Sequence, residues 1–166
     1  MSYNHKTYML DCATRLTDIG HTEDAPKFFR ISSIGHLDEV LSNLTQIQFP
    51  ALLVHDNMEG SLGDRNTSNN YIDTPYYVFY IVKHVELEDH DGREAAKKEC
   101  KTIGLKILSK MVHDKRDLLH GLTFLQFANI PYQTIGPIGD RCFGVMFSFS
   151  VSENANLIYD TNDWDT

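Results

Sequence analysis

The chain has 166 residues, of which 42% are hydrophobic and 23% charged, and its formal net charge is −8. This composition is ordinary for a globular domain, and no apolar run approaches the ~20 residues that a membrane-spanning helix needs. The acidic balance disfavours proteins that hold nucleic acid by general phosphate attraction, because such binding requires many lysines and arginines. We therefore expect one domain, over residues 1–166, with no membrane span and no general affinity for DNA.

The cysteines and the first residues bear on the cellular compartment. The three cysteines are an odd number, lie far apart and form no Cys-x-x-Cys pattern. The first seven residues are polar, and no apolar segment of a secretory signal follows them. These features predict reduced, buried thiols in a protein made in the cytosol.

The first third of the chain predicts two short helices and two strands. Helical spacing of apolar residues predicts a helix over about Asn4–Ile19 and a second helix over residues 37–44. Phe28–Ile31 has the composition of a short strand or an extended arm. Ala51–Val54 follows Pro50, which ends any preceding helix, and is predicted to be a buried strand.

The segment Asp56–Thr74 is predicted to be a long loop, because it is rich in Gly, Asn, Ser and Asp and poor in apolar residues. Loops of this length inside a domain are uncommon, and they are often functional or ordered by a partner. We therefore expect this segment to project from the domain and to contact a neighbouring subunit or another protein. The candidate contact residues are Leu62, Asp64, Arg65, Asn66, Asn69 and Asn70.

The next two elements are a central strand and a long helix. Tyr76–Val85 is apolar at nearly every position, which predicts a strand covered on both faces. Asp91–Glu94 has capping-box spacing and is predicted to begin a helix that continues to about Asp114. One apolar stripe along this helix is expected to pack on the sheet. Its residues are Ala96, Cys100, Ile103, Ile107 and Met111.

The last third of the chain is predicted to complete the sheet. We expect Leu122–Phe127 to be a strand, Pro131–Asp140 an irregular turn, and Arg141–Val151 a strand in which apolar and small or polar residues alternate. Residues 1–30 are expected to be a helical extension and residues 155–166 an acidic tail. The predicted fold is α+β: a mostly antiparallel sheet packed against one long helix, with short N-terminal helices.

Sequence motifs for catalysis or cofactor binding are missing. Gly60–Gly63 and Gly136–Gly139 lack the flanking residues of a phosphate-binding loop or a dinucleotide fingerprint. No G-x-S-x-G nucleophile elbow is present. His55 and Asp56 could pair as a base and its orienting carboxylate, but no nucleophile lies near them in the sequence. We expect no enzyme activity, no catalytic residue, no cofactor and no metal.

The connection between the central strand and the long helix is strongly acidic. His84 and His90 flank its carboxylates, but metal ligands must converge, and these residues run from a strand into a turn. Solvated turn residues are the favoured interpretation, and a metal site is the alternative. In an assembly, this turn is the best candidate for an acidic surface that faces a channel or a partner. Its residues are Glu86, Glu88, Asp89 and Asp91.

The order of the elements resembles that of the phage tail-terminator and neck proteins. The matching segments are F-P-A-L-L-V at Phe49–Val54, the strand leading to the D-G-R-E helix start at Tyr76–Glu94, and the aromatic last strand at Gly139–Phe149. The resemblance covers roughly residues 35–152. The first 30 residues and the acidic tail Tyr159–Thr166 have no counterpart in it.

The resemblance implies a structural protein of the virion, assembled in the host cytoplasm. Its copies would form a ring of six or twelve at the head-tail junction, between the connector and the tail-tube proteins. DNA would pass through the ring without specific binding, which suits an acidic subunit that repels phosphate. Two other classes remain open: a small α+β binding or accessory module, and a small-molecule enzyme without a recognisable motif.

Overall fold

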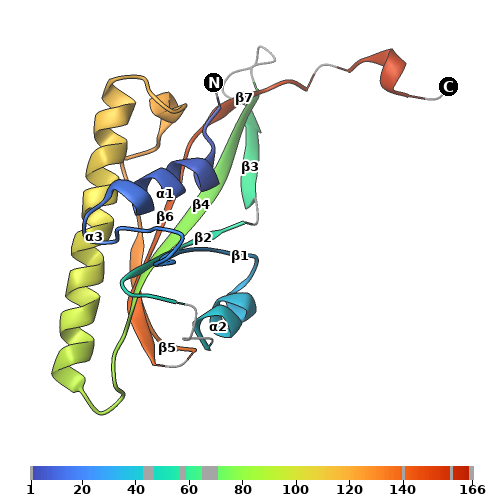
Figure 1. Cartoon of the computed structure of the whole chain (residues 1–166). Coiled ribbons are helices and arrows are strands. Elements are labelled where there is room, and N and C mark those ends of the chain that lie inside the picture. The colour runs from blue at the N-terminus through green and yellow to red at the C-terminus, as the bar shows by residue number, and fades with distance from the viewer. Residues whose placement is uncertain are drawn as a thin grey trace.

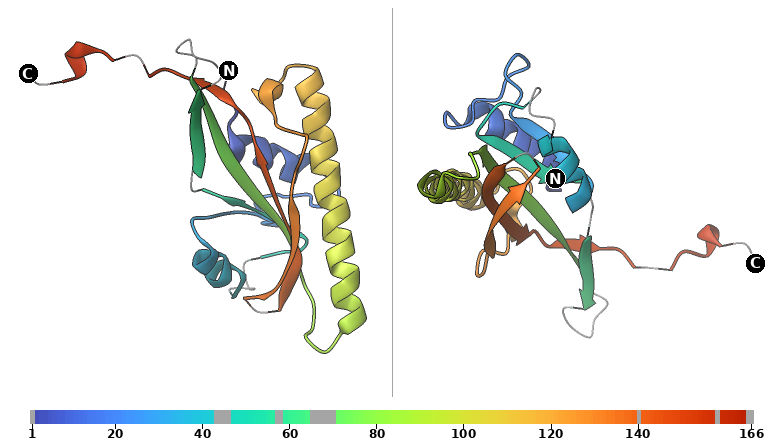
Figure 2. Two further views of the ribbon diagram at one scale, coloured as in Figure 1. Left: turned by 180° about the vertical axis from the view of Figure 1, so that it is seen from behind. Right: turned by 90° about the horizontal axis from the view of Figure 1, so that it is seen from below.

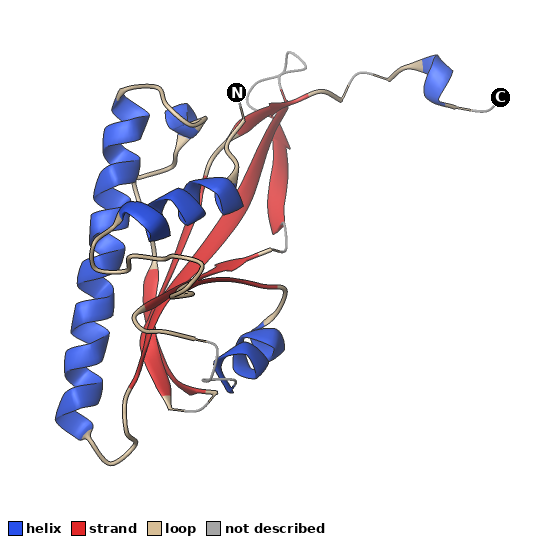
Figure 3. Cartoon of the chain, viewed as in Figure 1, coloured by secondary structure: helices blue, strands red, loops and turns tan. Residues whose placement is uncertain are grey.

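The computed structural model describes residues 2–42, 47–56, 59–64, 71–139, 141–157 and 159–164. The three α-helices of this part are α1 (His5–Arg15), α2 (Ile34–Ser42) and α3 (His90–Arg116). The strands are β1 (Phe28–Ile31), β2 (Ala51–His55), β3 (Glu59–Asp64), β4 (Tyr71–His84), β5 (Tyr132–Ile138), β6 (Cys142–Ser150) and β7 (Glu153–Ala155). The α+β fold class is therefore confirmed (Figure 3). None of the described helices is long and apolar enough to cross a membrane.

All the strands belong to one twisted sheet with the order β1-β2-β4-β6-β5, and β3 and β7 pair with β4 outside this path. The β1–β2 pair is parallel, and the pairs that involve β4 or β6 are antiparallel. β4 is the longest strand, with 14 residues, or about 45 Å of extended chain. Its second half lies between β2 and β6, and its first half lies between β3 and β7 (Figure 1).

Two hydrophobic cores lie on opposite faces of the sheet. In β2, Leu52 and Val54 belong to the core beneath α1 and α3, whereas Ala51 and Leu53 belong to the core beneath α2. β4 alternates between the two cores over Phe79–Val82, and all four of these residues are buried. The prediction of a central strand covered on both faces is therefore confirmed.

Helix α3 lies along the sheet and buries the stripe that its sequence predicts (Figure 1). Its predicted start is wrong by two positions, because the N-cap is Asp89, whose carboxylate accepts a hydrogen bond from the Gly92 backbone N–H at 2.8 Å. Asp91 lies instead in the first turn, where a negative charge is favourable beside the positive end of the helix dipole. The buried residues predicted for the stripe are Ala96, Cys100, Ile103, Ile107 and Met111.

Helix α1 is part of the main core and does not form a separate layer. Asn4 caps it by accepting a hydrogen bond from the Thr7 backbone N–H at 2.9 Å, and the helix ends at Arg15, earlier than predicted. The Tyr8 hydroxyl donates to the buried Asp114 carboxylate of α3 at 2.7 Å. Lys110 donates to the same oxygen at 2.6 Å. This network ties α1 to α3 within a core that is mostly apolar.

Two predicted elements in the last third of the chain are wrong. Pro131–Asp140 was expected to be a turn, but it contains β5, an edge strand with a register shift between Ile135 and Ile138. An edge position tolerates Pro137, because no partner needs its missing N–H. Leu122–Phe127 was expected to be a strand, but it begins with a 3₁₀ helix over Leu122–Phe124.

All three cysteine thiols are buried, as the sequence predicts. Cys12 and Cys100 lie in the core beneath α1 and α3, and Cys142 lies in the core beneath α2. Burial raises the pKa of Cys12 and the pKa of Cys100 to about 12. These two thiols therefore remain protonated at neutral pH and serve as packing groups.

Candidate functional site

Within its described residues, the segment predicted to be a long loop is mostly strand. Asp56–Thr74 contains β3 and the beginning of β4, which pair from Glu59 opposite Tyr76 to Asp64 opposite Tyr71. We call β3, residues 71–76 of β4, and β7 the arm. Alternation failed as a guide here because every residue of β3 is exposed, so neither face carries an apolar pattern. Of the candidate contact residues, Leu62 and Asp64 lie in β3, and Arg65, Asn66, Asn69 and Asn70 lie outside the described residues.

The arm presents an open strand edge. Within the described part of the chain, β3 pairs only with β4, and its outer edge faces no other strand. β3 approaches β4 closely at Gly60, where a side chain would collide with β4: a Cβ there would lie only 2.8 Å from the Pro75 Cα. Leu62, near the middle of β3, is 62% exposed. An open edge with an exposed leucine is a template for pairing with another chain.

The C-terminal segment, of which residues 156–157 and 159–164 are described, extends from the arm away from the rest of the protein (Figures 1 and 2). The Tyr159 and Trp164 rings stack on each other with centroids 5.9 Å apart. Both rings remain largely exposed, at 66% and 62%, and Leu157 is 51% exposed. The segment thus combines exposed apolar groups with the acidic composition that the sequence shows.

The acidic turn between β4 and α3 is exposed, but two of its carboxylates are engaged. Asp89 caps α3, and Glu86 forms an ion pair with Arg141. Glu88 and Asp91 are exposed beside them. No group of three metal-ligating side chains converges in the described residues, here or elsewhere. The role of this turn as a channel or partner surface stays a prediction.

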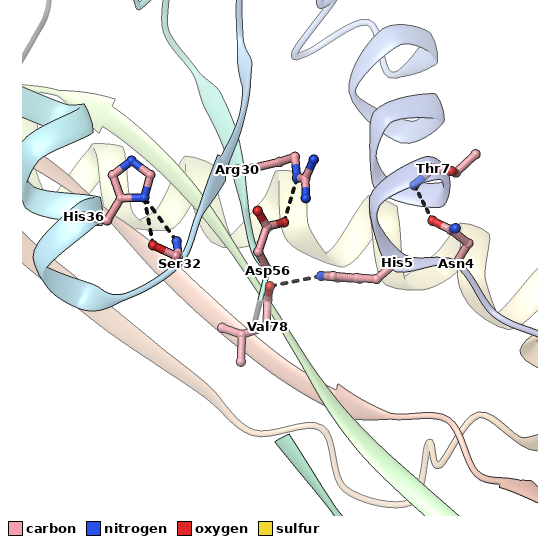
Figure 4. A network of polar contacts seen from close by, with 8 residues as sticks. All are labelled: Asn4, His5, Thr7, Arg30, Ser32, His36, Asp56 and Val78. Carbon is pink, nitrogen blue, oxygen red and sulfur yellow. Dashed lines mark hydrogen bonds and ion pairs between the residues drawn. The ribbon is translucent and has the colours of Figure 1, made fainter. Parts of the chain in front are cut away.

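A small polar pocket lies between the N-terminus and the ends of β1 and β2. Figure 4 shows its lining residues Asn4, His5, Arg30 and Asp56. Its volume is about 230 Å³. At its edge, the Arg30 Nε donates to the Asp56 Oδ1 at 2.7 Å. The lining residues are Tyr3, Asn4, His5, Lys6, Arg30, Val54, His55, Asp56 and Tyr77.

His55 and Asp56 of this pocket stand out in the sequence, but the residues that the N-terminus brings beside them do not. One signal was available, since His5 falls at the helical spacing of Tyr8, Met9 and Cys12, which are all buried. A histidine on a buried stripe needs polar partners, and this requirement points to a local polar site.

The contacts of His5 fix its chemistry. Its Nε2 lies 3.1 Å from the Val78 carbonyl oxygen, which can only accept, so Nε2 carries the proton. Its Nδ1 then accepts from the Tyr3 hydroxyl at 3.2 Å. Burial lowers the pKa of His5 to about 4, although the hydrogen bond to Val78 opposes this change. With both ring nitrogens occupied, His5 holds α1 on β4 and is not available as a general base.

Two features of the described residues are therefore candidates for function: the arm with its C-terminal segment, and the polar pocket. The pocket has no serine, threonine or cysteine among its described lining residues, and the Asp56 carboxylate in it is paired with Arg30. The arm offers an open edge and exposed apolar groups. Comparison with known proteins finds no protein family that matches the chain and no curated protein that is similar to it.

Proposed function

We propose that this chain is a structural subunit of a phage head-tail junction, which assembles with copies of itself into a ring around the DNA channel. The sequence resemblance to tail-terminator and neck proteins suggests this role. The observation that carries the proposal is the exposed arm, in which β3 has an open edge and Leu62 points to no core.

The arm supports assembly because proteins usually protect such edges. Natural edge strands are blunted by charged side chains, proline, bulges or a covering element. β3 carries charge only at its two ends, Glu59 and Asp64, contains no lysine or proline, and pairs with β4 without a register shift. An edge left open in this way is suited to a regular partner, and a neighbouring copy in a ring supplies one at every position.

The charge of the protein supports a passive DNA conduit. With a formal net charge of −8, the subunit repels phosphate, and a channel of such subunits would let DNA slide without holding it. In this role the subunit has no catalytic function. Its partners are copies of itself, in a ring of six or twelve, and the neighbouring connector and tail-tube proteins.

If the protein is instead a small-molecule enzyme, the polar pocket is one place where a substrate could bind. Its histidine with the strongest pKa shift, His5, is occupied on both nitrogens, and Asp56 is paired with Arg30. These contacts favour a structural role for the pocket. The alternative of a binding or accessory module would leave the protein monomeric, so the oligomeric state separates it from the ring.

The first test is the mass of the purified protein by size-exclusion chromatography with light scattering, combined with negative-stain microscopy. We expect closed rings of six or twelve copies, and a strict monomer at high concentration would reject the proposal. The substitution Leu62→Asp should leave the free energy of unfolding within about 0.5 kcal/mol, as for other surface changes, and should disrupt the ring.

The matched control for Leu62→Asp is Leu119→Asp in the connection that follows α3. Leu119 is also exposed, at 45%, but it lies outside the arm and outside the acidic turn. We expect this variant to form normal rings. Equal loss of assembly in both variants would show that any new surface charge is disruptive, and the arm would lose its special role.

A further inference from the structure

Helix α3 carries an unusual share of the positive charge of this acidic protein. It contains eight of the fifteen lysines and arginines against four carboxylates. Its solvent side has one stripe at helical spacing, with basic residues towards both ends and Leu105 and Val112 between them. Leu105 is 50% exposed. We call this set the outer stripe, and it comprises Lys98, Lys101, Leu105, Ser109, Val112 and Arg116.

The C-terminal segment has the opposite character. From Glu153 onward the sequence contains four carboxylates and no lysine or arginine. Tyr159 and Trp164 are exposed, and no described part of their own chain covers them. The segment and the outer stripe are therefore complementary both in charge and in apolar content.

These two surfaces lie on opposite sides of the protein. Every view places α3 at one side of the sheet and the end of the C-terminal segment at the other (Figures 1 and 2). Residues 156–164 span at most about 30 Å when fully extended. In this arrangement, complementary surfaces on opposite sides can meet between copies that are arranged head to tail, which is the geometry that closes a ring.

We infer that the C-terminal segment of one subunit docks on the outer stripe of α3 in the next subunit. This inference rests on the proposed function, because it requires a ring of identical copies. The Tyr159 and Trp164 rings pack on Leu105 and Val112. Lys98 of the stripe already pairs with Glu94, so the Asp160 carboxylate pairs with Lys101 or Arg116. Aromatic side chains of this kind are typical anchors of protein interfaces.

Trp164 provides a direct probe, because it is the only tryptophan in the chain. In the full-length protein, its fluorescence emission should move to shorter wavelength when rings form, because the indole leaves water. Leu105→Asp should abolish this shift and weaken association by about 30-fold or more, as expected for loss of an anchored contact. Leu118→Asp is the matched control, since Leu118 is 69% exposed but lies beyond α3. It should assemble normally.

A mixing experiment tests the head-to-tail pairing. The full-length double variant Tyr159→Ser/Trp164→Ser lacks the segment's anchors, and Leu105→Asp lacks the stripe's anchor. Each variant alone should fail to close rings. In the mixture, the intact segment of one variant meets the intact stripe of the other, so the two should associate and the emission of the remaining Trp164 should shift.

The outcomes separate the inference from the proposed function. Rings that form with solvent-exposed Trp164, or rings that survive both variants, would overturn the docking inference and leave the ring proposal intact. A full-length protein that stays monomeric would reject both. Variants that mix without association would also overturn the inference, since one intact segment and one intact stripe would then be insufficient for pairing.

Discussion

At the scale of single residues, the contact between α3 and β6 depends on a glycine in the middle of the helix. A Cβ built at Gly104 would lie 2.1 Å from the Phe147 Cε2, well inside van der Waals contact. The Phe147 ring is buried and stacks on Phe79 with centroids 5.0 Å apart, so it has little room to move. Gly104 lies between the predicted stripe residues, yet the sequence alone gave no reason for a helix-weakening residue there.

The substitution Gly104→Val should therefore destabilise the protein. Glycine is the less favourable residue in a helix interior, so propensity alone would predict a small gain. The collision with Phe147 should outweigh that gain and cost about 1–3 kcal/mol, the usual range for overpacking a core. Urea unfolding followed by circular dichroism measures the difference.

The matched control for Gly104→Val is Thr102→Val, which places a valine two residues away on the exposed side of α3. Its free energy of unfolding should stay within about 0.5 kcal/mol of the wild-type value. If both valines cost the same, the effect would come from the helix backbone, and the close approach to Phe147 would have no energetic role.

At the scale of elements, α1 is held on the sheet by a buried polar contact as well as by its apolar face. His5 links the first turn of α1 to the Val78 carbonyl of β4, and Tyr3 donates to the other ring nitrogen. Only the neutral ring fits this arrangement. If His5 were protonated in the folded state, its Nδ1 would also carry a hydrogen. The Tyr3 hydroxyl, which donates to Nδ1, would then have to turn and accept.

The stability of the protein should therefore fall as the pH decreases from 6.5 to 4. In this window the unfolded chain binds a proton at His5 near its ordinary pKa of 6.5, whereas the folded state binds it only near pH 4. The loss from this residue is at most about 3 kcal/mol, and the nearby Asp56 partly opposes it. Urea unfolding at several pH values should show a flatter profile for His5→Gln.

The comparison of the wild-type protein with His5→Gln has its own control at pH 8, where His5 is neutral in the folded and in the unfolded state. Any difference there reports the packing cost of glutamine, and the change of that difference with pH reports the proton. Parallel profiles from pH 8 to pH 4 would contradict the prediction, because they would mean that His5 titrates alike in the folded and unfolded states.

The elements that the sequence predicted correctly are those that bury a face. The stripe of α3, the apolar run of β4 and the alternation of β6 each record contact with a core. The elements that it missed, β3 and β5, are mostly exposed. Backbone hydrogen bonds hold them in the sheet, and these do not require apolar side chains at alternate positions. The pocket was missed in part for another reason, since its residues come from elements far apart in the chain.

At the scale of the whole molecule, the charges are separated. Helix α3 is basic, while the C-terminal segment and the turn before α3 are acidic, and several α3 lysines already contact neighbouring side chains. Lys83, Lys106 and Lys110 are examples of cations paired with carboxylates. With a formal net charge of −8, the protein as a whole repels a DNA backbone.

The purified protein should consequently show no measurable affinity for duplex DNA at physiological salt. Fluorescence anisotropy of a labelled duplex, measured at protein concentrations at which rings are present, provides the test. A known DNA-binding protein in the same buffer serves as the positive control. Micromolar binding that weakens steeply with added salt would contradict the prediction and would indicate a protein that engages nucleic acid directly.

The length of β4 has a consequence for how this protein can change over generations. One uninterrupted strand belongs to the body through Phe79–Val82 and to the arm through Tyr71–Tyr76. A single residue inserted or deleted between these two parts would reverse the faces of the arm relative to the body, because side chains alternate along a strand. It would also disturb the pairing of Tyr76–Val78 with β6, so the interface on the arm is inherited together with the core on which the fold depends.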